Sequence, residues 1–109
     1  MSNARFSRPK HRRDSNHSSI VGELRKLGFV VADISQSGAG VGDILVGWTL
    51  APGVIFMYEL KPAGVPSAQK LTAAEQRFHD AWPGHIAIAT TTEEIIDDMK
   101  RHGRTLDYL

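Results

Sequence analysis

The segment VIFMYELK, residues 54–61, constrains the fold of this chain more than any other stretch. It is the longest strand-like run, and both of its alternating faces are apolar until Glu59 and Lys61 end the pattern. A strand with two apolar faces needs cover on both sides. We therefore expect a central strand of a sheet, covered by helices or by a partner chain, in a single domain of 109 residues.

The residues before this strand predict one helix and two further strands. Isoleucine and leucine recur at helical spacing over residues 16–27, and Gly28 is the expected end of that helix. Residues 29–34 and 43–48 are rich in β-branched side chains, which is typical of strands. The serine- and glycine-rich stretch between them is predicted to be a loop.

The residues after the central strand predict a helix that begins with a capping box. Thr72 is followed three residues later by Glu75, so each side chain can bond the backbone amide of the other. Phe78, Ala81 and Trp82 give this helix an apolar face, which we expect to pack on the sheet.

A strand over residues 85–90 and a final helix complete the pattern. The helix is expected to follow a Thr92 cap and to end at Gly103, with its isoleucines and Met99 facing inward. The charges of EEIIDDMKR within it indicate a solvated face. The predicted class is α/β, with a small mixed β-sheet flanked by helices in the order α-β-β-β-α-β-α.

Charge is distributed unevenly along the chain, although the net charge is only +1. Residues 1–13 contain five lysines and arginines and no acid, so subtraction from the totals of 13 and 12 leaves residues 14–109 with 8 bases and 12 acids. The chain therefore divides into a basic arm, residues 1–13, and an acidic domain, residues 14–109. Such an arm suits a polyanion such as DNA, and a solubilising tail is the alternative.

Composition excludes several classes of protein. The absence of cysteine rules out disulfides, thiolate zinc sites and cysteine nucleophiles, so any metal must be bound by oxygen or imidazole. No apolar run approaches about 20 residues, and the start of the chain has no signal-peptide pattern. We therefore expect a cytoplasmic protein with no membrane partner.

Asp43 and the pair Glu59 and Lys61 form the candidate catalytic group. Asp43 opens the strand before the central one, so a hairpin through TLAPG would bring it opposite Glu59 and Lys61. Two carboxylates suit Mg²⁺, with the backbone carbonyl of Leu60 as a further candidate ligand. A metal with Lys61 beside it favours phosphodiester hydrolysis. A plain ion pair between Glu59 and Lys61 at the sheet edge is the alternative.

These residues resemble the signature of the PD-(D/E)XK nuclease superfamily, which has an acid on one strand and (D/E)-x-K on the next. Asp43 and the ELK of residues 59–61 match it. More narrowly, the chain is similar to phage-type nucleases of the VRR-NUC group, relatives of Holliday-junction resolvases, over residues 12–101. The similar segments are, in order, RRDSNHSSIVGELRKLGF, GDILVG, YELKP and KLTAAEQRFHDAW.

The resemblance implies a restriction-endonuclease-like core and an endonuclease that cuts DNA and depends on Mg²⁺ or Mn²⁺. Asp43 and Glu59 would be the metal ligands and Lys61 the catalytic cation. Members of the group often act on branched DNA, and stand-alone members are often homodimers. A phage or prophage origin follows from the same likeness.

Two positions depart from the family pattern. Gly42 stands where proline often precedes the metal-binding aspartate, and the first helix lacks an acid near its start. Asn16 and His17 are candidates for that place, and Glu23, one to two turns further on, is a candidate additional metal ligand.

The residues expected to contact DNA lie in the basic arm, the first helix, the glycine loop and the stretch after the catalytic group. They are Arg12, Arg13, Asn16, His17, Ser37, Gly40, Gln69, Lys70 and Gln76. His79 lies on the same predicted helix as Gln76, and most of the histidines are expected at the surface. The glycines of GAGVGDILVG are interpreted as keeping side chains away from the metal, so that a DNA backbone can approach.

Two other functions are weighed against the nuclease. A nuclease fold that has lost catalysis through its altered first helix would be a DNA-binding module. A nucleotide-binding loop fits poorly, because GAGVG lacks the spacing and the lysine of phosphate-binding motifs and leads into a strand where those motifs open a helix.

Overall fold

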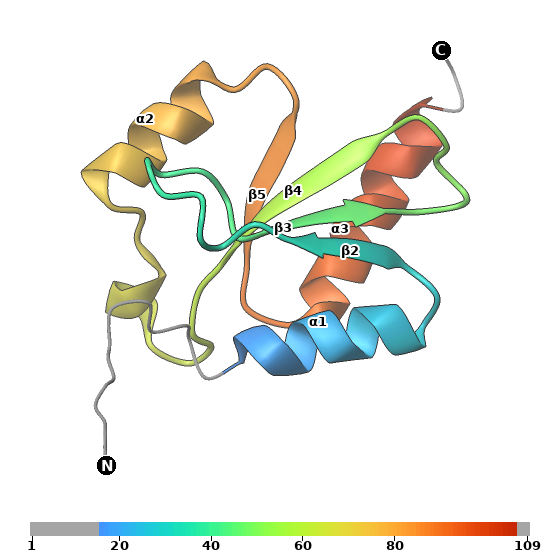
Figure 1. Ribbon diagram of the computed structural model, residues 1–109, viewed down its shortest axis with the longest axis horizontal. Coiled ribbons are helices and arrows are strands. Elements are labelled where there is room, and N and C mark those ends of the chain that lie inside the picture. Colours follow the sequence, from blue (N-terminus) through green and yellow to red (C-terminus); the bar gives the residue numbers. More distant parts are fainter. Residues whose placement is uncertain (1–15, 107–109) are drawn as a thin grey trace.

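The computed structural model describes residues 16–106, so Arg12, Arg13 and the rest of the basic arm lie outside the described residues. This part of the chain forms a four-stranded mixed sheet with three α-helices (Figure 1). The α/β class is therefore confirmed, and the elements follow the predicted order. No helix within residues 16–106 has both the length and the apolar character needed to cross a bilayer.

The elements lie close to their predicted positions. In chain order they are α1 (His17–Lys26), β2 (Val30–Asp33), β3 (Ile44–Gly47), β4 (Ile55–Leu60), the short 3₁₀ helix η1 (Pro66–Gln69), α2 (Ala73–Ala81), β5 (His85–Ala89) and α3 (Thr92–Leu106).

The apolar segment of residues 54–61 forms β4, an interior strand as predicted. The sheet order is β2-β3-β4-β5, in which β4 runs antiparallel to β3 and parallel to β5. Five of the six residues of β4 are buried. Parallel neighbours need a crossover connection, and the segment that contains η1 and α2 supplies it.

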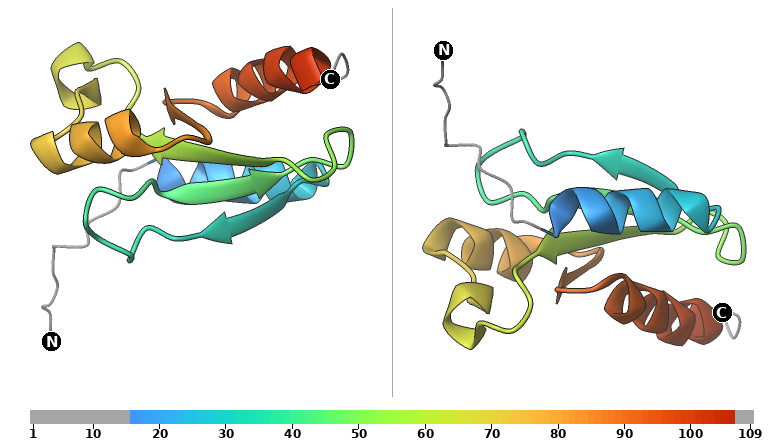
Figure 2. Two further views of the ribbon diagram at one scale, coloured as in Figure 1. Left: turned by 90° about the horizontal axis from the view of Figure 1, so that it is seen from above. Right: turned by 90° about the horizontal axis from the view of Figure 1, so that it is seen from below.

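Helices α1 and α3 cover one face of the sheet (Figure 2). Phe56, Tyr58 and Leu60 of β4 point toward them and share a single buried cluster with Leu24 of α1 and Met99 of α3. Side chains alternate along a strand, so Glu59 points to the opposite face. The core thus fixes which face of β4 carries the candidate catalytic group.

The prediction that α2 packs on the sheet through its aromatic residues is wrong. No residue of α2 is buried. Phe78 and Trp82 stack on one another with ring centroids 5.3 Å apart, and Trp82 remains 40% exposed. Figure 1 shows α2 beyond one end of the sheet, beside the loop that joins β2 to β3.

Both predicted ends of the last helix are also wrong. Thr92 is the first residue of α3, and the preceding Thr91 caps it by accepting a hydrogen bond from the Glu94 amide at 3.1 Å. The helix continues past Gly103, and this glycine is a packing position. A Cβ atom there would lie 2.8 Å from the ring of Trp48.

Candidate functional site

The hairpin of β3 and β4 brings Asp43 to the end of β4 that carries Glu59 and Lys61. Asp43 directly precedes β3, and its backbone amide donates to the carbonyl of Tyr58 at 2.8 Å. Its Oδ2 atom accepts a hydrogen bond from the Leu60 amide, also at 2.8 Å. The three predicted catalytic residues therefore meet at one end of the sheet, with the Asp43 side chain held by the backbone of β4.

Glu59 is a buried carboxylate with an unusual environment. It is 5% exposed, and its Oε1 atom has no hydrogen-bond partner among the described residues. Its Oε2 atom lies 3.8 Å from Lys61 Nζ. Burial and the neighbouring carboxylates of Asp43 and Glu75 raise the pKa of Glu59 to about 9. An ionised Glu59 is therefore unfavourable unless a cation in addition to Lys61 accompanies it.

Glu75 on α2 is a member of this group that the sequence analysis missed. Its Oε1 atom accepts hydrogen bonds from Lys61 Nζ and from the Thr72 amide, both at 2.9 Å. Burial raises the pKa of Glu75, but the bonds from Thr72 and Lys61 outweigh it and lower that pKa below its ordinary value. The predicted capping box is confirmed. That motif identified the cap and gave no sign that the same carboxylate reaches Lys61.

Asn16 lies at the same end of the sheet, at the start of α1. Its Nδ2 atom donates to the carbonyls of Lys61 at 3.1 Å and Thr90 at 2.8 Å. Its Oδ1 atom is buried and has no hydrogen-bond partner among the described residues. Asn16 therefore ties the first helix to the residues that follow β4 and β5.

The other two first-helix candidates lie elsewhere. His17 is 2% exposed and its Nε2 atom lies 3.1 Å from Asp33 Oδ2, so the expectation that most histidines lie at the surface does not hold for His17, and its ring offers almost no exposed area to DNA. Glu23 accepts a hydrogen bond from the hydroxyl of Thr92 and so faces α3. The neighbouring carboxylates that raise the pKa of Glu59 are those of Asp43 and Glu75. The predicted metal ligand Glu23 is not among them.

Two glycines of the glycine loop pack closely against other parts of the protein. Gly40 has a φ of +80°, and a Cβ atom there would lie 2.4 Å from the backbone oxygen of Ala74 in α2. A Cβ atom at Gly42 would lie 2.8 Å from the side chain of Met57. Both glycines therefore have a packing role that the sequence analysis did not predict, and the interpretation that they leave room for DNA stays a prediction.

The remaining predicted DNA contacts surround the α2 end of the sheet. The exposed ones are Ser37, Lys70 and Gln76. Gln69 is half-buried and donates to the carbonyl of Pro62 at 3.1 Å. His79 is also half-buried, its Nε2 atom has no hydrogen-bond partner among the described residues, and burial lowers its pKa.

A second polar cluster, which the sequence analysis did not predict, joins β5 to α3. Asp98 is 8% exposed and accepts hydrogen bonds from the Tyr58 hydroxyl at 2.6 Å and His85 Nε2 at 2.5 Å. Burial alone would raise the pKa of Asp98, but these bonds lower it below its ordinary value. The interpretation of EEIIDDMKR as a solvated face is therefore wrong at Asp98. His85, Asp98 and His102 each offer a ligand atom, all within 4.8 Å of one another, and together could hold a metal ion.

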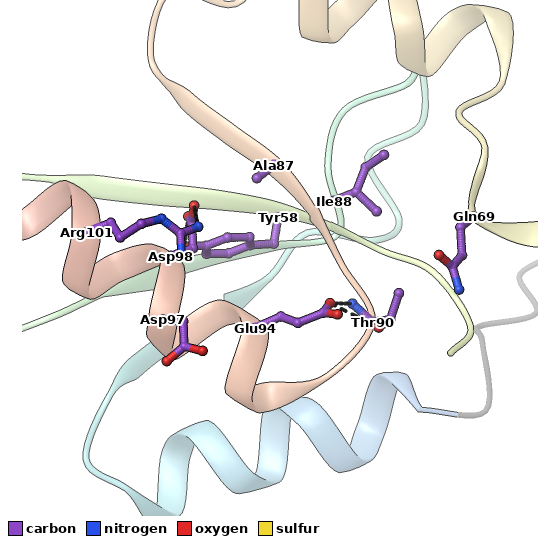
Figure 3. Close-up of a pocket in the computed structure, with 9 residues that line it drawn as sticks. All are labelled: Tyr58, Gln69, Ala87, Ile88, Thr90, Glu94, Asp97, Asp98 and Arg101. Atoms are coloured by element: carbon purple, nitrogen blue, oxygen red, sulfur yellow. Dashed lines mark hydrogen bonds and ion pairs between the residues drawn. The ribbon is translucent and has the colours of Figure 1, made fainter. Parts of the chain in front are cut away.

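Asp98 also borders a pocket of about 470 Å³ (Figure 3). Tyr58, Asp98 and Arg101 lie together at one side of it, and Gln69 lies at the other. Asp43, Glu59 and Lys61 do not line this pocket. The candidate catalytic group and the pocket are thus separate features.

Comparisons of the chain with family models, with curated proteins and with solved structures found no significant match. The resemblance to the nuclease superfamily consequently depends on the sequence motifs alone.

Proposed function

We propose that this chain is a metal-dependent endonuclease that hydrolyses DNA phosphodiester bonds with Asp43, Glu59 and Lys61. The observation that carries the proposal is the buried carboxylate of Glu59 beside Asp43, with one oxygen that lacks a hydrogen-bond partner among the described residues. The D…ExK motif and the order of the similar segments support the same function.

The charges in the group fit a divalent cation. Asp43, Glu59 and Glu75 supply three carboxylates and Lys61 supplies one ammonium, so the fully ionised group carries three negative charges against one positive charge. A divalent cation would balance this excess and relieve the repulsion that raises the pKa of Glu59. Oxygen donors of this kind match Mg²⁺ or Mn²⁺.

Asp43 and Glu59 would hold the ion, with the Leu60 carbonyl as a further oxygen ligand. When bound, such an ion acidifies a coordinated water and offsets charge on the phosphoryl group. The Lys61 ammonium, 3.8 Å from Glu59, would donate hydrogen bonds to the phosphate oxygens as negative charge develops there. Glu75 would act as a positioning residue, because it holds Lys61 at 2.9 Å.

A DNA-binding module without catalysis is the second candidate. Asn16 favours it, because an amide stands near the place where the family has an acid on the first helix, and an amide is a weaker metal ligand than a carboxylate. The two functions differ in what Asp43 does, since only the nuclease requires Asp43 for metal binding and cleavage.

The decisive experiment is a cleavage panel. The full chain is stripped of metal, supplied with Mg²⁺ or Mn²⁺, and incubated with duplex, flap, single-stranded and four-way-junction DNA. We expect Asp43→Ala, Glu59→Ala and Lys61→Ala each to reduce cleavage by at least about 100-fold while circular dichroism shows an intact fold. Light scattering on the same preparations measures the homodimer that the resemblance implies.

Matched controls separate catalysis from general changes in charge. Asp80→Asn removes an exposed carboxylate from α2, and Lys26→Ala removes an exposed lysine from the far end of α1, so both should cleave normally. Retained activity in all three catalytic variants contradicts the proposal. Tight DNA binding without cleavage on any substrate, and without Mn²⁺ binding that depends on Asp43, supports the binding module.

A further inference from the structure

The cluster of His85, Asp98 and His102 shares no residue with the Asp43 group. His85 is the first residue of β5, and Asp98 and His102 lie four residues apart on α3. Residues four apart on a helix project from the same face. The docking of α3 beside β5 therefore brings two imidazoles and a carboxylate together from two elements.

The distances between the ligand atoms come within about 1 Å of those in a four-coordinate transition-metal site. Ligands about 2.0–2.1 Å from a tetrahedral zinc ion are separated from one another by roughly 3.4 Å. His85 Nε2 lies 2.5 Å from Asp98 Oδ2, and His102 Nδ1 lies 3.4 Å from Asp98 Oδ1. All three ligand atoms fall within 4.8 Å of one another, so side-chain shifts on the order of 1 Å would suffice.

Neighbouring groups hold the carboxylate in place. The Tyr58 hydroxyl donates to Asp98 Oδ2 at 2.6 Å from the middle of β4. Hydrogen bonds of this kind orient metal ligands and commonly change metal affinity by 10–100-fold. His102 Nδ1 also lies 2.8 Å from the backbone carbonyl of Asp98, and a metal bound at Nδ1 would replace this hydrogen bond.

The cluster is accessible from solvent. The side chain of His102 is 45% exposed, which leaves a path for an ion. A pocket of about 480 Å³ lies on the histidine side and is lined by His85, His102, Trp82 and Ile55 among others. Three protein ligands with open space beside them leave a fourth coordination position for water.

We propose that His85, Asp98 and His102 form a binding site for a zinc-class transition-metal ion that links β5 to α3. Two imidazoles and one carboxylate suit Zn²⁺ and its neighbours in the first transition series, whereas Mg²⁺ prefers oxygen ligands alone. The site is independent of the proposed nuclease, because it uses different residues and different ligand chemistry. Binding would stabilise the folded chain by mass action.

Arg101 gives the proposal an additional test. Its guanidinium lies 3.4 Å from Asp98 Oδ1, so a metal ion at Asp98 would share the carboxylate with an existing positive charge. Like charges at this separation repel. Arg101→Gln should therefore bind Zn²⁺ at least as tightly as the unmodified chain, while loss of a ligand should weaken binding.

The test is a calorimetric titration of ZnCl₂ into the full, metal-stripped chain without an affinity tag. We expect one ion at this cluster in each chain, in addition to any ion held by the Asp43 group, and at least about tenfold weaker binding at the cluster in His102→Ala. Co²⁺ in place of Zn²⁺ should give the visible absorption bands of a four-coordinate site. His79→Ala and Glu93→Gln are the controls, because they alter a histidine and an exposed acid outside the cluster and should bind as the unmodified chain does.

Two results of the titration would overturn the proposal. One is a stoichiometry well below one ion per chain, and the other is unchanged Zn²⁺ affinity in folded His102→Ala. Asp98→Asn and His85→Ala would disrupt the hydrogen bonds among Tyr58, His85 and Asp98. The role of His85 is therefore tested by NMR on the unmodified chain. Zn²⁺ must shift the imidazole NMR signals of both His85 and His102, and unshifted signals contradict the site.

Discussion

Lys61 Nζ lies 2.9 Å from Glu75 Oε1 and 3.8 Å from Glu59 Oε2, so the cation of the ExK motif is held more closely by α2 than by its own strand. Glu75 also closes the capping box of α2. One carboxylate therefore couples the start of a helix to the position of the candidate catalytic lysine.

Glu75→Gln should lower DNA cleavage by about tenfold, equivalent to about 1.4 kcal/mol in the activation barrier. Glutamine keeps the capping box, because it can still accept the Thr72 amide, but it loses the charge that holds Lys61. The measurement is single-turnover cleavage together with the thermal midpoint. Asp80→Asn is the control on the same helix, and equal rates for both variants would show that Glu75 acts only as a cap.

Glu59→Gln should stabilise the metal-free protein at pH 8. The unfolded chain releases the Glu59 proton near pH 4.5, whereas the folded chain retains it up to about pH 9. In this window the folded state binds more protons, so stability falls as pH rises, by at most about 1.4 kcal/mol per pH unit. Glutamine cannot ionise and removes that slope.

Urea unfolding in the presence of a chelator measures this effect at pH 5 and pH 8. The difference in free energy of unfolding between Glu59→Gln and the unmodified chain should favour the variant more at pH 8 than at pH 5. Glu93→Gln, which changes an exposed glutamate of α3, is the control and should leave the slope unchanged. A Glu59→Gln variant with the slope of the unmodified chain would mean that Glu59 ionises normally in the folded state.

Asn16→Ala should lower the free energy of unfolding by about 2 kcal/mol, because two hydrogen bonds to backbone carbonyls are lost at about 1 kcal/mol each. Asn16→Asp should be no more stable than Asn16→Ala. A carboxylate cannot donate to the carbonyls of Lys61 and Thr90, although it restores the acid typical of the resembling family. Chemical denaturation of both variants checks the prediction, with exposed Ser19→Ala as control. An Asn16→Asp variant as stable as the unmodified chain would show that the two hydrogen bonds from Asn16 are dispensable.

Gly40→Ala should destabilise the protein by about 1–3 kcal/mol more than Gly38→Ala. Both glycines have positive φ angles, +80° and +75°, so the backbone strain of alanine is similar at the two positions. Only at Gly40 would the added Cβ atom meet the backbone of Ala74, while Gly38 has no atom within 4 Å. Denaturant midpoints of the pair isolate the contact between the loop and α2, and equal midpoints would contradict it.

The sequence was most informative where neighbouring elements determine the geometry. Alternating apolar positions located β4, and the short turn after β3 set a hairpin that brings Asp43 to Glu59 and Lys61. Such contacts depend on local register, which side-chain periodicity and loop length largely determine. The candidate catalytic group could therefore be assembled without knowledge of the tertiary fold.

The residues that were missed depend on how helices dock. Glu75 reaches Lys61 only because α2 lies beyond the end of the sheet, and its apolar residues had predicted packing on the sheet itself. His85 and Asp98 meet only because α3 lies beside β5, and neither has a spacing in the sequence that marks a pair. Periodicity identifies the buried side of a helix but does not determine which polar group it will meet.

Strand β4 contributes side chains to the Asp43 group on one face of the sheet and to the Asp98 cluster on the other. This alternation of side chains constrains how the sequence of β4 can change. Tyr58 faces α3 and supports Asp98, whereas its neighbour Glu59 faces the opposite side and Asp43. Inserting or deleting one residue in β4 would exchange these faces, because side chains alternate with a period of two. Substitutions in β4 can therefore affect one cluster alone, but a change of length would remove both together, and descendants of this chain should vary the composition of β4 without altering its length.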